Sequence, residues 1–342
     1  PPPPPPPPPP PFFFSTHTPQ PAILSGLVGS EMCIRDRIAG EVAEAVAVSE
    51  SVGNRICGLY YLESYCEQLI SGRVNGKASP EVNLARSSSV YVDAKDGFAQ
   101  PAFSKGLPEV LKVAQENGIA SLSVGRAHTC TSLGFFTKKI AQAGFLGLGF
   151  TNASPIVAPP GGKSRIIGTN PIAFSVPDGN GGIAMQFDQS TTTVALGKIT
   201  MAKAAGKSIP EGWALDKDGR PTTSPEEAIQ GTLVSAGGYK GWGFGLMAEI
   251  LVAGMTGGRI SKNVAPLKAK EGEPHNLGQF YIVIDPASGA SFYNRLEELT
   301  AVISAEEGTR MPGQYTIPQS EVDVPDELWG LAISLSKAKP FE

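Results

Sequence analysis

One histidine stands directly before the part of the sequence that is richest in glycine, amide and proline residues. His128 follows a predicted strand at 119–124 and precedes a predicted helix at 132–144. An imidazole titrates near neutral pH, so at a junction between a strand and a helix it is a candidate proton carrier. We therefore predict that His128 is catalytic. A core histidine with satisfied hydrogen bonds is the alternative.

Short polar side chains follow His128 at positions where glycine and proline restrict the backbone. The two clearest stretches are Phe-Thr-Asn-Ala at 150–153 and Gly-Thr-Asn-Pro at 168–171. Pro171 should push Asn170 toward an extended conformation, and hydroxyl and amide groups held there suit a carboxylate or an amide. A plain turn is the alternative at 168–171. The predicted substrate contacts are Thr169 and Asn170, and the predicted cofactor contacts are Thr129, Thr151 and Asn152.

Two further turns each precede a predicted helix and offer backbone N–H groups to an anion. Residues 188–192 read Asp-Gln-Ser-Thr-Thr, and residues 237–241 read Gly-Gly-Tyr-Lys-Gly. Helix N-termini bind phosphate, although hydroxyl side chains in a first turn can also serve as caps alone. The predicted cofactor contacts here are Asp188, Thr191, Lys198, Tyr239 and Lys240, and the predicted substrate contact is Ser190.

Neither turn matches a standard nucleotide-binding motif. The Gly-Lys-Ser/Thr ending of a P-loop is absent, and no Gly-x-Gly-x-x-Gly follows a strand in the Rossmann manner. A dinucleotide would therefore bind outside the Rossmann motif. We predict no metal site, because His128 and Cys130 offer two ligands at most and zinc sites need three or four.

Composition narrows the class of protein. The 342 residues carry 28 basic and 32 acidic side chains without a basic stripe, which argues against nucleic acid and membrane-surface partners. The longest apolar run, 241–257, is interrupted by Glu249 and is too short for a membrane span. We expect its central part, 242–255, to be buried in the core or at a dimer interface. Few cysteines, without Cys-x-x-Cys, indicate a reducing, cytoplasmic setting.

Hydrophobic periodicity predicts an α/β fold with a mixed sheet. The predicted helices are 59–69, 103–114, 132–144 and 194–205, and the predicted strands are 89–93, 119–124, 145–150, 165–167, 172–176, 183–187 and 281–285. We divide the chain into a helical N-terminal part at 38–85, an α/β cofactor-binding domain at 86–230, and a mainly helical part at 231–342. This last part is assigned to dimerisation and returns one strand to the sheet.

The first 37 residues differ from the rest. They begin with eleven prolines, and Met-Cys-Ile-Arg-Asp-Arg at 32–37 back-translates naturally to a transposon end used in preparing sequencing libraries. We interpret residues 1–37 as a non-native read-through segment. A polyproline II tail that binds SH3-like domains is the alternative.

Several of these motifs occur together, in the same order, in a known family. The set comprises His128, the stretches 149–155 and 160–162, Gly-Thr-Asn-Pro at 168–171, Ala-Leu-Gly-Lys-Ile at 195–199 and the glycine loop 237–241. Over about residues 38–317 the chain resembles the type-2 malate/L-lactate dehydrogenases, a family that includes ureidoglycolate and sulfolactate dehydrogenases and cyclic ketimine reductases. The resemblance implies an NAD- or NADP-dependent oxidoreductase with a non-Rossmann cofactor fold, acting as a homodimer.

The chain departs from this family at its early helix. The family pattern Ser-His-Gly-x-x-Arg, in which Ser and His transfer the proton and Arg holds the substrate carboxylate, is matched by Ile-Cys-Gly-Leu-Tyr-Tyr at 56–61. Cys57 thus stands in the place of the histidine and Tyr61 in the place of the arginine. By its position Cys57 competes with His128 as the catalytic proton donor, provided that its pKa is suitable, and Tyr61 is a candidate substrate contact. Tyr239 replaces a second family histidine.

Reduction of a 2-oxo acid needs a proton source, donors for the carboxylate and a dry pocket besides the nicotinamide. The sequence favours a dehydrogenase or reductase acting on a small 2-hydroxy or 2-oxo acid. A reductase of a cyclic imino acid is one alternative, and a cofactor-binding protein that has lost catalysis is another. The choice between NAD and NADP stays open.

Overall fold

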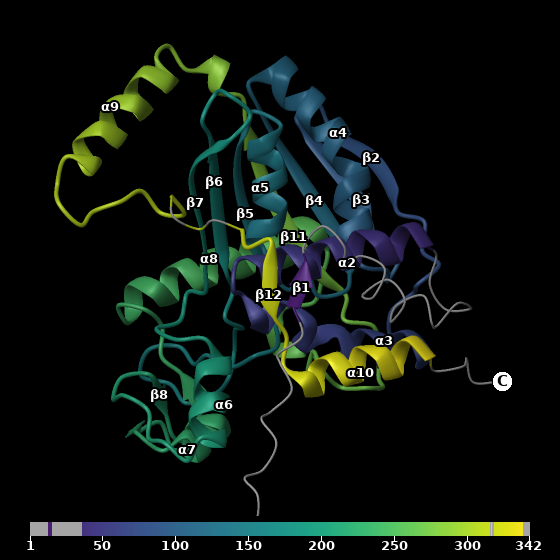
Figure 1. The fold of residues 1–342 in the computed structure, drawn as a ribbon, viewed down its shortest axis with the longest axis vertical. Coiled ribbons are helices and arrows are strands. Elements are labelled where there is room, and N and C mark those ends of the chain that lie inside the picture. The colour runs from purple at the N-terminus through teal and green to yellow at the C-terminus, as the bar shows by residue number, and fades with distance from the viewer. Residues whose placement is uncertain (1–12, 16–35, 315, 317, 338–342) are drawn as a thin grey trace, which may run out of the picture.

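The computed structural model describes residues 13–15, 36–314, 316 and 318–337 (Figure 1). Of the first 37 residues, which we interpret as non-native, only 13–15, 36 and 37 belong to this set, and the rest lie outside the described residues. Strand β1 (Phe13–Ser15) pairs antiparallel with β12 (Glu321–Asp323).

A mixed sheet of seven strands forms the centre of the molecule. Its order is β2 (Glu81–Arg86), β3 (Ser89–Asp93), β4 (Ile119–Ala127), β11 (Leu277–Ile284), β5 (Leu146–Thr151), β6 (Ile172–Pro177) and β7 (Ile183–Gln189). Only β3 and β4 run parallel, and every other neighbouring pair is antiparallel. A Rossmann sheet is mostly parallel, so the mixed, non-Rossmann architecture predicted from the sequence is confirmed.

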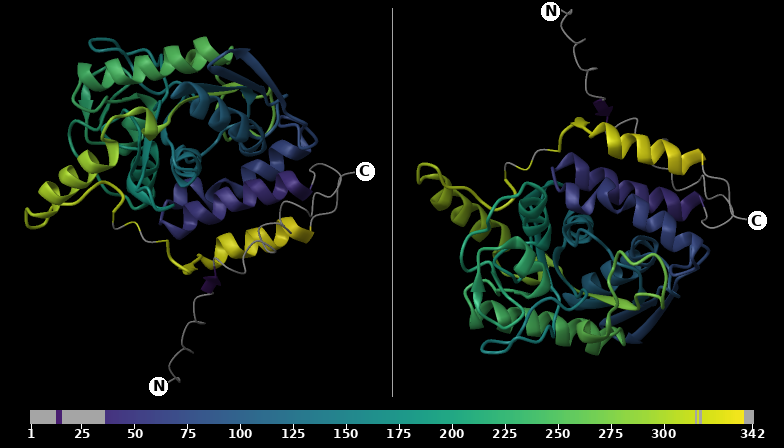
Figure 2. Two further views of the ribbon diagram at one scale, coloured as in Figure 1. Left: turned by 90° about the horizontal axis from the view of Figure 1, so that it is seen from above. Right: turned by 90° about the horizontal axis from the view of Figure 1, so that it is seen from below.

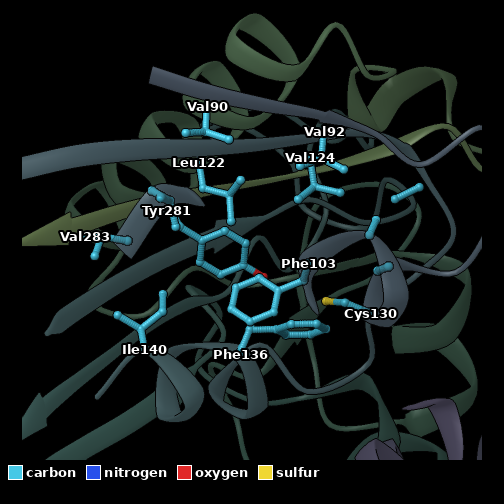
Figure 3. Close-up of a cluster of buried hydrophobic side chains, with 14 of the residues drawn as sticks. Val90, Val92, Phe103, Leu122, Val124, Cys130, Phe136, Ile140, Tyr281 and Val283 are labelled. Atoms are coloured by element: carbon cyan, nitrogen blue, oxygen red, sulfur yellow. The ribbon is translucent and has the colours of Figure 1, made fainter. Parts of the chain in front are cut away.

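Alternation along β11 explains how helices cover both faces of the sheet. Tyr281 and Val283 belong to one buried cluster, which α4 (Ala99–Asn117) and α5 (Gly134–Gln142) complete (Figure 3). Phe280 packs instead in a second cluster with α8 (Tyr239–Thr256). Because successive side chains of a strand point to opposite faces, α8 covers the face opposite α4 and α5.

A helical layer lies beside the sheet. Helices α2 (Asp36–Ser51), α3 (Leu62–Ile70) and α10 (Asp326–Lys337) lie side by side and share a buried cluster that includes Val42 and Tyr65 (Figure 2). Two 3₁₀ turns, η1 (Arg55–Cys57) and η2 (Leu59–Tyr61), join α2 to α3. The layer therefore brings the early segment 55–61 to the edge of the α/β core.

A small lobe follows the end of β7. Helices α6 (Leu196–Ala204) and α7 (Pro225–Gln230) pack on a three-stranded sheet that was not predicted from the sequence. The strands are β8 (Ala214–Leu215), β9 (Pro221–Thr222) and β10 (Thr232–Leu233). The domain limits at 85 and 230 stay predictions.

Two helices expose apolar side chains. On α8 the exposed residues are Tyr239, Phe244, Leu246, Met247, Ile250 and Met255. Helix α8 packs on the sheet through its other face, so burial of 242–255 in the core alone is wrong, while burial of the exposed face at a dimer interface stays a prediction. Helix α9 (Phe292–Ser304) projects from the body, and none of its residues, all of which are described, is buried (Figure 1). Among the described residues, no helix is long and apolar enough to cross a membrane.

Candidate active site

The early segment owes its shape to a buried carboxylate. Leu59 N–H donates a hydrogen bond of 2.7 Å to Glu50 Oε1 of helix α2. A Cβ at position 58 would lie 2.1 Å from the same oxygen, so any residue larger than glycine would displace the Glu50 carboxylate. Burial raises the pKa of Glu50 above its ordinary value, and the Leu59 hydrogen bond opposes that shift. Glu50 and Gly58 together hold the two turns that present Cys57 and Tyr61.

Cys57 is half-buried and carries its proton at neutral pH. Burial, and next the charge of Asp188, raise the pKa of Cys57 to about 12, while a hydrogen bond with Asn54 acts in the opposite direction. Burial also raises the pKa of Tyr61, with Cys57 as the next cause. The charge state of the Cys57 thiol is therefore coupled to the Asp188 carboxylate on one side and to the Tyr61 phenol on the other.

Asp188 joins this group to the start of helix α5. Its Oδ2 accepts hydrogen bonds from Gly134 N–H at 2.7 Å and from Ser132 Oγ at 3.2 Å. Burial raises the pKa of Asp188, and the Gly134 hydrogen bond opposes the shift. Solvent still reaches the residue although protein atoms surround most of its carboxylate. Asp188 is thus an accessible carboxylate beside a protonated thiol.

His128 lies in different surroundings. Its side chain is only 2% exposed, stacks on His275 with ring centroids 4.1 Å apart, and meets the rings of Tyr65 and Phe98 edge-on. The distance from its Nε2 to Gln68 Oε1 is 2.5 Å. The amide nitrogen of Gln68 donates to two carbonyls, so the other side-chain atom, Oε1, is an acceptor. The imidazole proton of His128 is therefore on His128 Nε2.

The protonation of His128 follows from this packing. Burial lowers its pKa well below 6.5, and His275 and Arg73 add to the effect. The remaining nitrogen, Nδ1, has no hydrogen-bond partner among the described residues. The imidazole is therefore neutral, and its only proton is bonded to Gln68. This geometry fits the alternative of a core histidine and does not support our prediction that His128 donates the proton.

His275, which stacks on His128, was not among the predicted site residues. Burial lowers its pKa to about 3, with Arg73 as the next cause, and its Nδ1 accepts a hydrogen bond of 3.3 Å from Thr129 N–H. Thr129 itself is buried. No short-range signal links residues 128 and 275, because β11 brings them together only in the folded sheet.

The Gly-Thr-Asn-Pro motif is occupied by structural hydrogen bonds. Asn170 is fully buried, and its Nδ2 donates to Gly245 O at 3.0 Å and to Glu249 Oε2 at 2.7 Å. Both amide hydrogens are used, which leaves none for a substrate. Its φ is +37°, so the expectation of an extended conformation before Pro171 is wrong. Asparagine tolerates positive φ, and the two bonds to α8 hold it there.

Thr151 and Asn152 also bond within the protein. Thr151 Oγ1 donates to Gly278 O at 2.8 Å, and Asn152 Nδ2 donates to Arg259 O at 2.8 Å. Glu249 organises the surroundings, since Ser261 donates to it through both its N–H and its Oγ at 2.6 Å. This structural role of Glu249 was not predicted from the sequence. A single carboxylate within an apolar run was nevertheless a sign of a buried, hydrogen-bonded acid.

The two predicted anion-binding turns adjoin in space. Thr169 O accepts hydrogen bonds from Thr191 N–H and Thr191 Oγ1, at 2.9 and 3.0 Å. Thr191 O in turn accepts from Ala236 N–H at 3.0 Å, directly before the glycine loop. Ser190 Oγ lies 2.9 Å from Thr192 Oγ1. The strand end at 188–192 therefore connects Asp188 with the start of α8.

The cationic and aromatic candidates lie at the surface. Lys240 and Tyr239 begin helix α8 and are exposed, as is Lys198 in the first turn of α6. Gly237 and Gly238 both have positive φ, which leaves the backbone open ahead of the helix. The structure thus couples Cys57 electrostatically to Tyr61 and Asp188, and it joins Thr191 to the turn before α8. His128 and Asn170 lie close to these groups but are buried.

Comparison with known proteins gives a consistent result. The sequence model of the family described as malate/L-lactate dehydrogenase matches residues 30–322. A (2R)-3-sulfolactate dehydrogenase (NADP(+)) of Chromohalobacter salexigens is 38% identical over 79% of this chain and 81% of its own length. A Δ1-pyrroline-2-carboxylate/Δ1-piperideine-2-carboxylate reductase of Pseudomonas syringae pv. tomato is 35% identical over 81% of each chain.

The solved structures agree with the sequence comparison. The crystal structure of Δ1-piperideine-2-carboxylate reductase from Pseudomonas syringae superposes with a TM-score of 0.87 and 29% identity, and covers 95% of this chain and 99% of that one. Both the sheet order and the early helical layer therefore belong to a shared fold. The chain is a member of the malate/L-lactate dehydrogenase family.

Proposed function

We propose that this protein is an NAD- or NADP-dependent oxidoreductase that transfers a hydride between nicotinamide and a small 2-hydroxy or 2-oxo acid. The observation that carries the proposal is the strand end at 188–192. At one end the charge of Asp188 acts on the protonated Cys57, and at the other Thr191 bonds to the turn that precedes α8. This segment thus connects the surroundings of a candidate proton donor with a candidate anion-binding helix start, the two parts that reduction of a carbonyl by a dinucleotide requires.

The residues around α8 suit a dinucleotide. Lys240 and Lys198 are exposed cations, and Gly237 and Gly238 have positive φ directly before the helix start. These residues would hold the phosphates, with Tyr239 and Thr191 alongside. When bound, the nicotinamide supplies the hydride. The relatives include enzymes named for both NADP(+) and NAD(+), so the proposal covers either cofactor.

Cys57 is the proton donor in this proposal. A thiol with a pKa of about 12 keeps its proton at neutral pH and hydrogen-bonds the substrate oxygen. An alkoxide is more basic than a thiolate, so the proton moves from sulfur to oxygen as charge develops there. The raised pKa of Asp188 makes it a suitable neighbour from which Cys57 regains a proton. Tyr61 remains protonated and contributes a second O–H donor.

Reduction of a cyclic imino acid is the second candidate. The structure of the piperideine-carboxylate reductase superposes on 95% of this chain. Several relatives at 34–35% identity are named as pyrroline-carboxylate reductases. A neutral thiol donor serves an imine nitrogen as well as a ketone oxygen. The third candidate is a family member that binds the cofactor without turnover. It is supported by Ile56, Cys57 and Tyr61, which replace the serine, histidine and arginine of the family pattern.

A nicotinamide fluorescence screen tests the three candidates. NADH and NADPH are each titrated into the protein, and their oxidation is followed with a panel of 2-oxo acids and cyclic imines. Turnover of a 2-oxo acid supports the leading proposal, and turnover of imines alone supports the second. Cofactor binding without any turnover supports the third. If neither NADH nor NADPH binds, all three candidate functions are overturned.

We further propose a homodimer that covers the exposed apolar face of α8. The six large apolar side chains on this face exceed what a monomer usually leaves in solvent, and a second copy of the chain supplies a matching surface. Light scattering after gel filtration measures the mass. Phe244→Glu should shift a dimer toward monomer, and a wild-type monomer would contradict the proposal. The sparse cysteines support a cytoplasmic location, which fractionation of the source cells tests.

A further inference from the structure

A lysine far along the chain reaches the turn that carries Tyr61. Lys268 Nζ lies 3.1 Å from the centre of the Tyr60 ring and 4.6 Å from that of Tyr61. It also donates a hydrogen bond of 2.9 Å to Tyr60 O. The lysine is half-buried, and the phenol of Tyr61 lies near Cys57 and Cys130. Lys268 is therefore a cation beside the candidate active site.

The segment around Lys268 is held in place through its backbone. Gln68 Nε2 donates to Leu267 O and Ala269 O, both at 2.7 Å. Arg73 Nη1 donates to Pro266 O at 3.0 Å and to Ala269 O at 2.6 Å. Carbonyls on both sides of Lys268 are thus bonded to helix α3 and the turn after it. Such anchoring lowers the entropy cost of binding a ligand with this side chain.

The charge of Lys268 lacks a close counterion. Within the described part of the chain no carboxylate forms an ion pair with it, whereas Lys270, two residues on, pairs with Glu67 at 2.5 Å. Burial lowers the pKa of Lys268 to about 8, and the more distant charge of Glu63 acts against the shift. A partly desolvated cation with only rings and a carbonyl around it gains most from an incoming anion.

We propose that Lys268 binds the carboxylate of the substrate at the edge of the site formed by Cys57 and Tyr61. The inference rests on the proposed function and names the residue that supplies positive charge where Tyr61 supplies none. Lysine has a flexible four-carbon stem, so its ammonium can leave the Tyr60 carbonyl for a ligand oxygen. An anionic substrate restores the counterion that the protein does not provide.

The proposal implies a defined pH dependence. The groups that face Lys268 are the rings of Tyr60 and Tyr61 from η2 and, at longer range, Glu63 from α3. Below a pH of about 8 the ammonium is charged, and above it the charge is lost. Affinity for a carboxylate ligand should therefore fall as the pH rises through this value. Lys268→Arg should remove that fall, because a guanidinium stays charged.

Binding of oxamate, an unreactive analogue of a 2-oxo acid, tests the proposal without requiring turnover. Calorimetry on protein saturated with NADPH gives its Kd, and a separate fluorescence titration gives the Kd of NADPH. Lys268→Met keeps the apolar stem against the tyrosine rings and should raise the oxamate Kd at least about tenfold while leaving NADPH binding unchanged. Lys270→Ala, the matched control, should change neither constant.

The outcomes separate this inference from the proposed function. If the wild type binds NADPH and oxamate, and Lys268→Met binds both equally well, the role of Lys268 is refuted while the proposed function stands. If neither NADPH nor NADH binds, the proposed function fails first, and if only NADH binds, the oxamate titrations are made on protein saturated with NADH. If NADPH binds but oxamate does not, the carboxylate site is refuted. A circular dichroism melt of each variant checks folding, and Lys268→Arg should bind oxamate like the wild type near neutral pH.

Discussion

Two polar clusters lie close together in this molecule, and they differ in what solvent and ligands can reach. Around His128 the groups are buried, neutral and hydrogen-bonded to one another, with His275, Gln68 and Arg73 as neighbours. Around Cys57 a protonated thiol adjoins Asp188, which solvent reaches. A titratable residue type therefore says little about catalysis until its burial and its partners are known.

Replacement of Cys57 gives the largest expected effect. Cys57→Ala removes the proton donor of the accessible cluster and should lower kcat by about 10²–10⁴-fold with NAD(P)H affinity unchanged. Steady-state kinetics on the best substrate from the screen gives kcat. The control is Cys66→Ala, which removes a buried thiol of the helical layer. Normal turnover by Cys57→Ala would show that another group donates the proton, and it would contradict the catalytic role given to the Cys57 cluster.

Replacement of His128 should act on stability instead. His128→Ala leaves Gln68 Oε1 without its donor and opens a cavity among Tyr65, Phe98 and His275. The free energy of unfolding should fall by about 2–4 kcal/mol, while kcat of the folded protein changes less than about tenfold. Urea unfolding and kinetics on the same sample measure both. A loss of kcat of a hundredfold or more at unchanged stability would restore His128 as the catalytic histidine.

The buried histidines also predict how stability depends on pH. Their pKa values are lowered in the folded state, that of His275 to about 3, whereas unfolded imidazoles protonate near 6.5. As the pH falls below 6.5 the unfolded state binds more protons, so each histidine lowers the free energy of unfolding by up to about 1.4 kcal/mol per pH unit. Above that pH both states are neutral and this contribution is constant.

Urea unfolding at about pH 7 and about pH 5 measures this slope. His275→Gln removes one of the two imidazoles and should make the slope shallower by up to about 1.4 kcal/mol per pH unit. Asp188 and Glu50, whose pKa values are raised, contribute with the opposite sign and are common to both proteins. Equal slopes for the wild type and the variant would show that the stacked pair is not the source.

The smallest expected effect concerns Lys240 at the start of α8. Lys240→Ala should weaken NAD(P)H binding by about 1–3 kcal/mol, the range for a lost charge-assisted hydrogen bond. A fluorescence titration gives the Kd. Lys217→Ala, in an exposed turn of the small lobe, is the matched control. An unchanged Kd for the Lys240 variant would show that Lys240 does not contact the cofactor.

The sheet was largely predictable, and its exceptions have physical causes. Strand β3 alternates buried and half-buried side chains, and most side chains of β4 are buried, so the sequence pattern of both strands indicates a strand. Strand β2 at 81–86 was missed because it is an edge strand in which apolar and polar residues alike are mostly exposed. The predicted strand at 165–167 reduces to an isolated bridge between Val157 and Ile167.

The site was predictable only in part. The sequence shows that Cys57 replaces a family histidine, and the structure places it beside Asp188, which was expected to bind the cofactor. The sequence cannot show that both amide hydrogens of Asn170 bond to α8, since that depends on a helix more than seventy positions along the chain. Lys268 gave no signal, because its relation to Tyr61 exists only across the folded layer.

The position of β11 has a consequence for how the chain is made. This strand pairs with β4 on one side and β5 on the other, yet it is synthesised long after both. Until Leu277–Ile284 emerges from the ribosome, β4 and β5 cannot complete their hydrogen bonds, and nascent chains expose two apolar strand edges. Folding is therefore governed by a late, long-range closure, and chains truncated before residue 277 should aggregate rather than form a smaller stable domain.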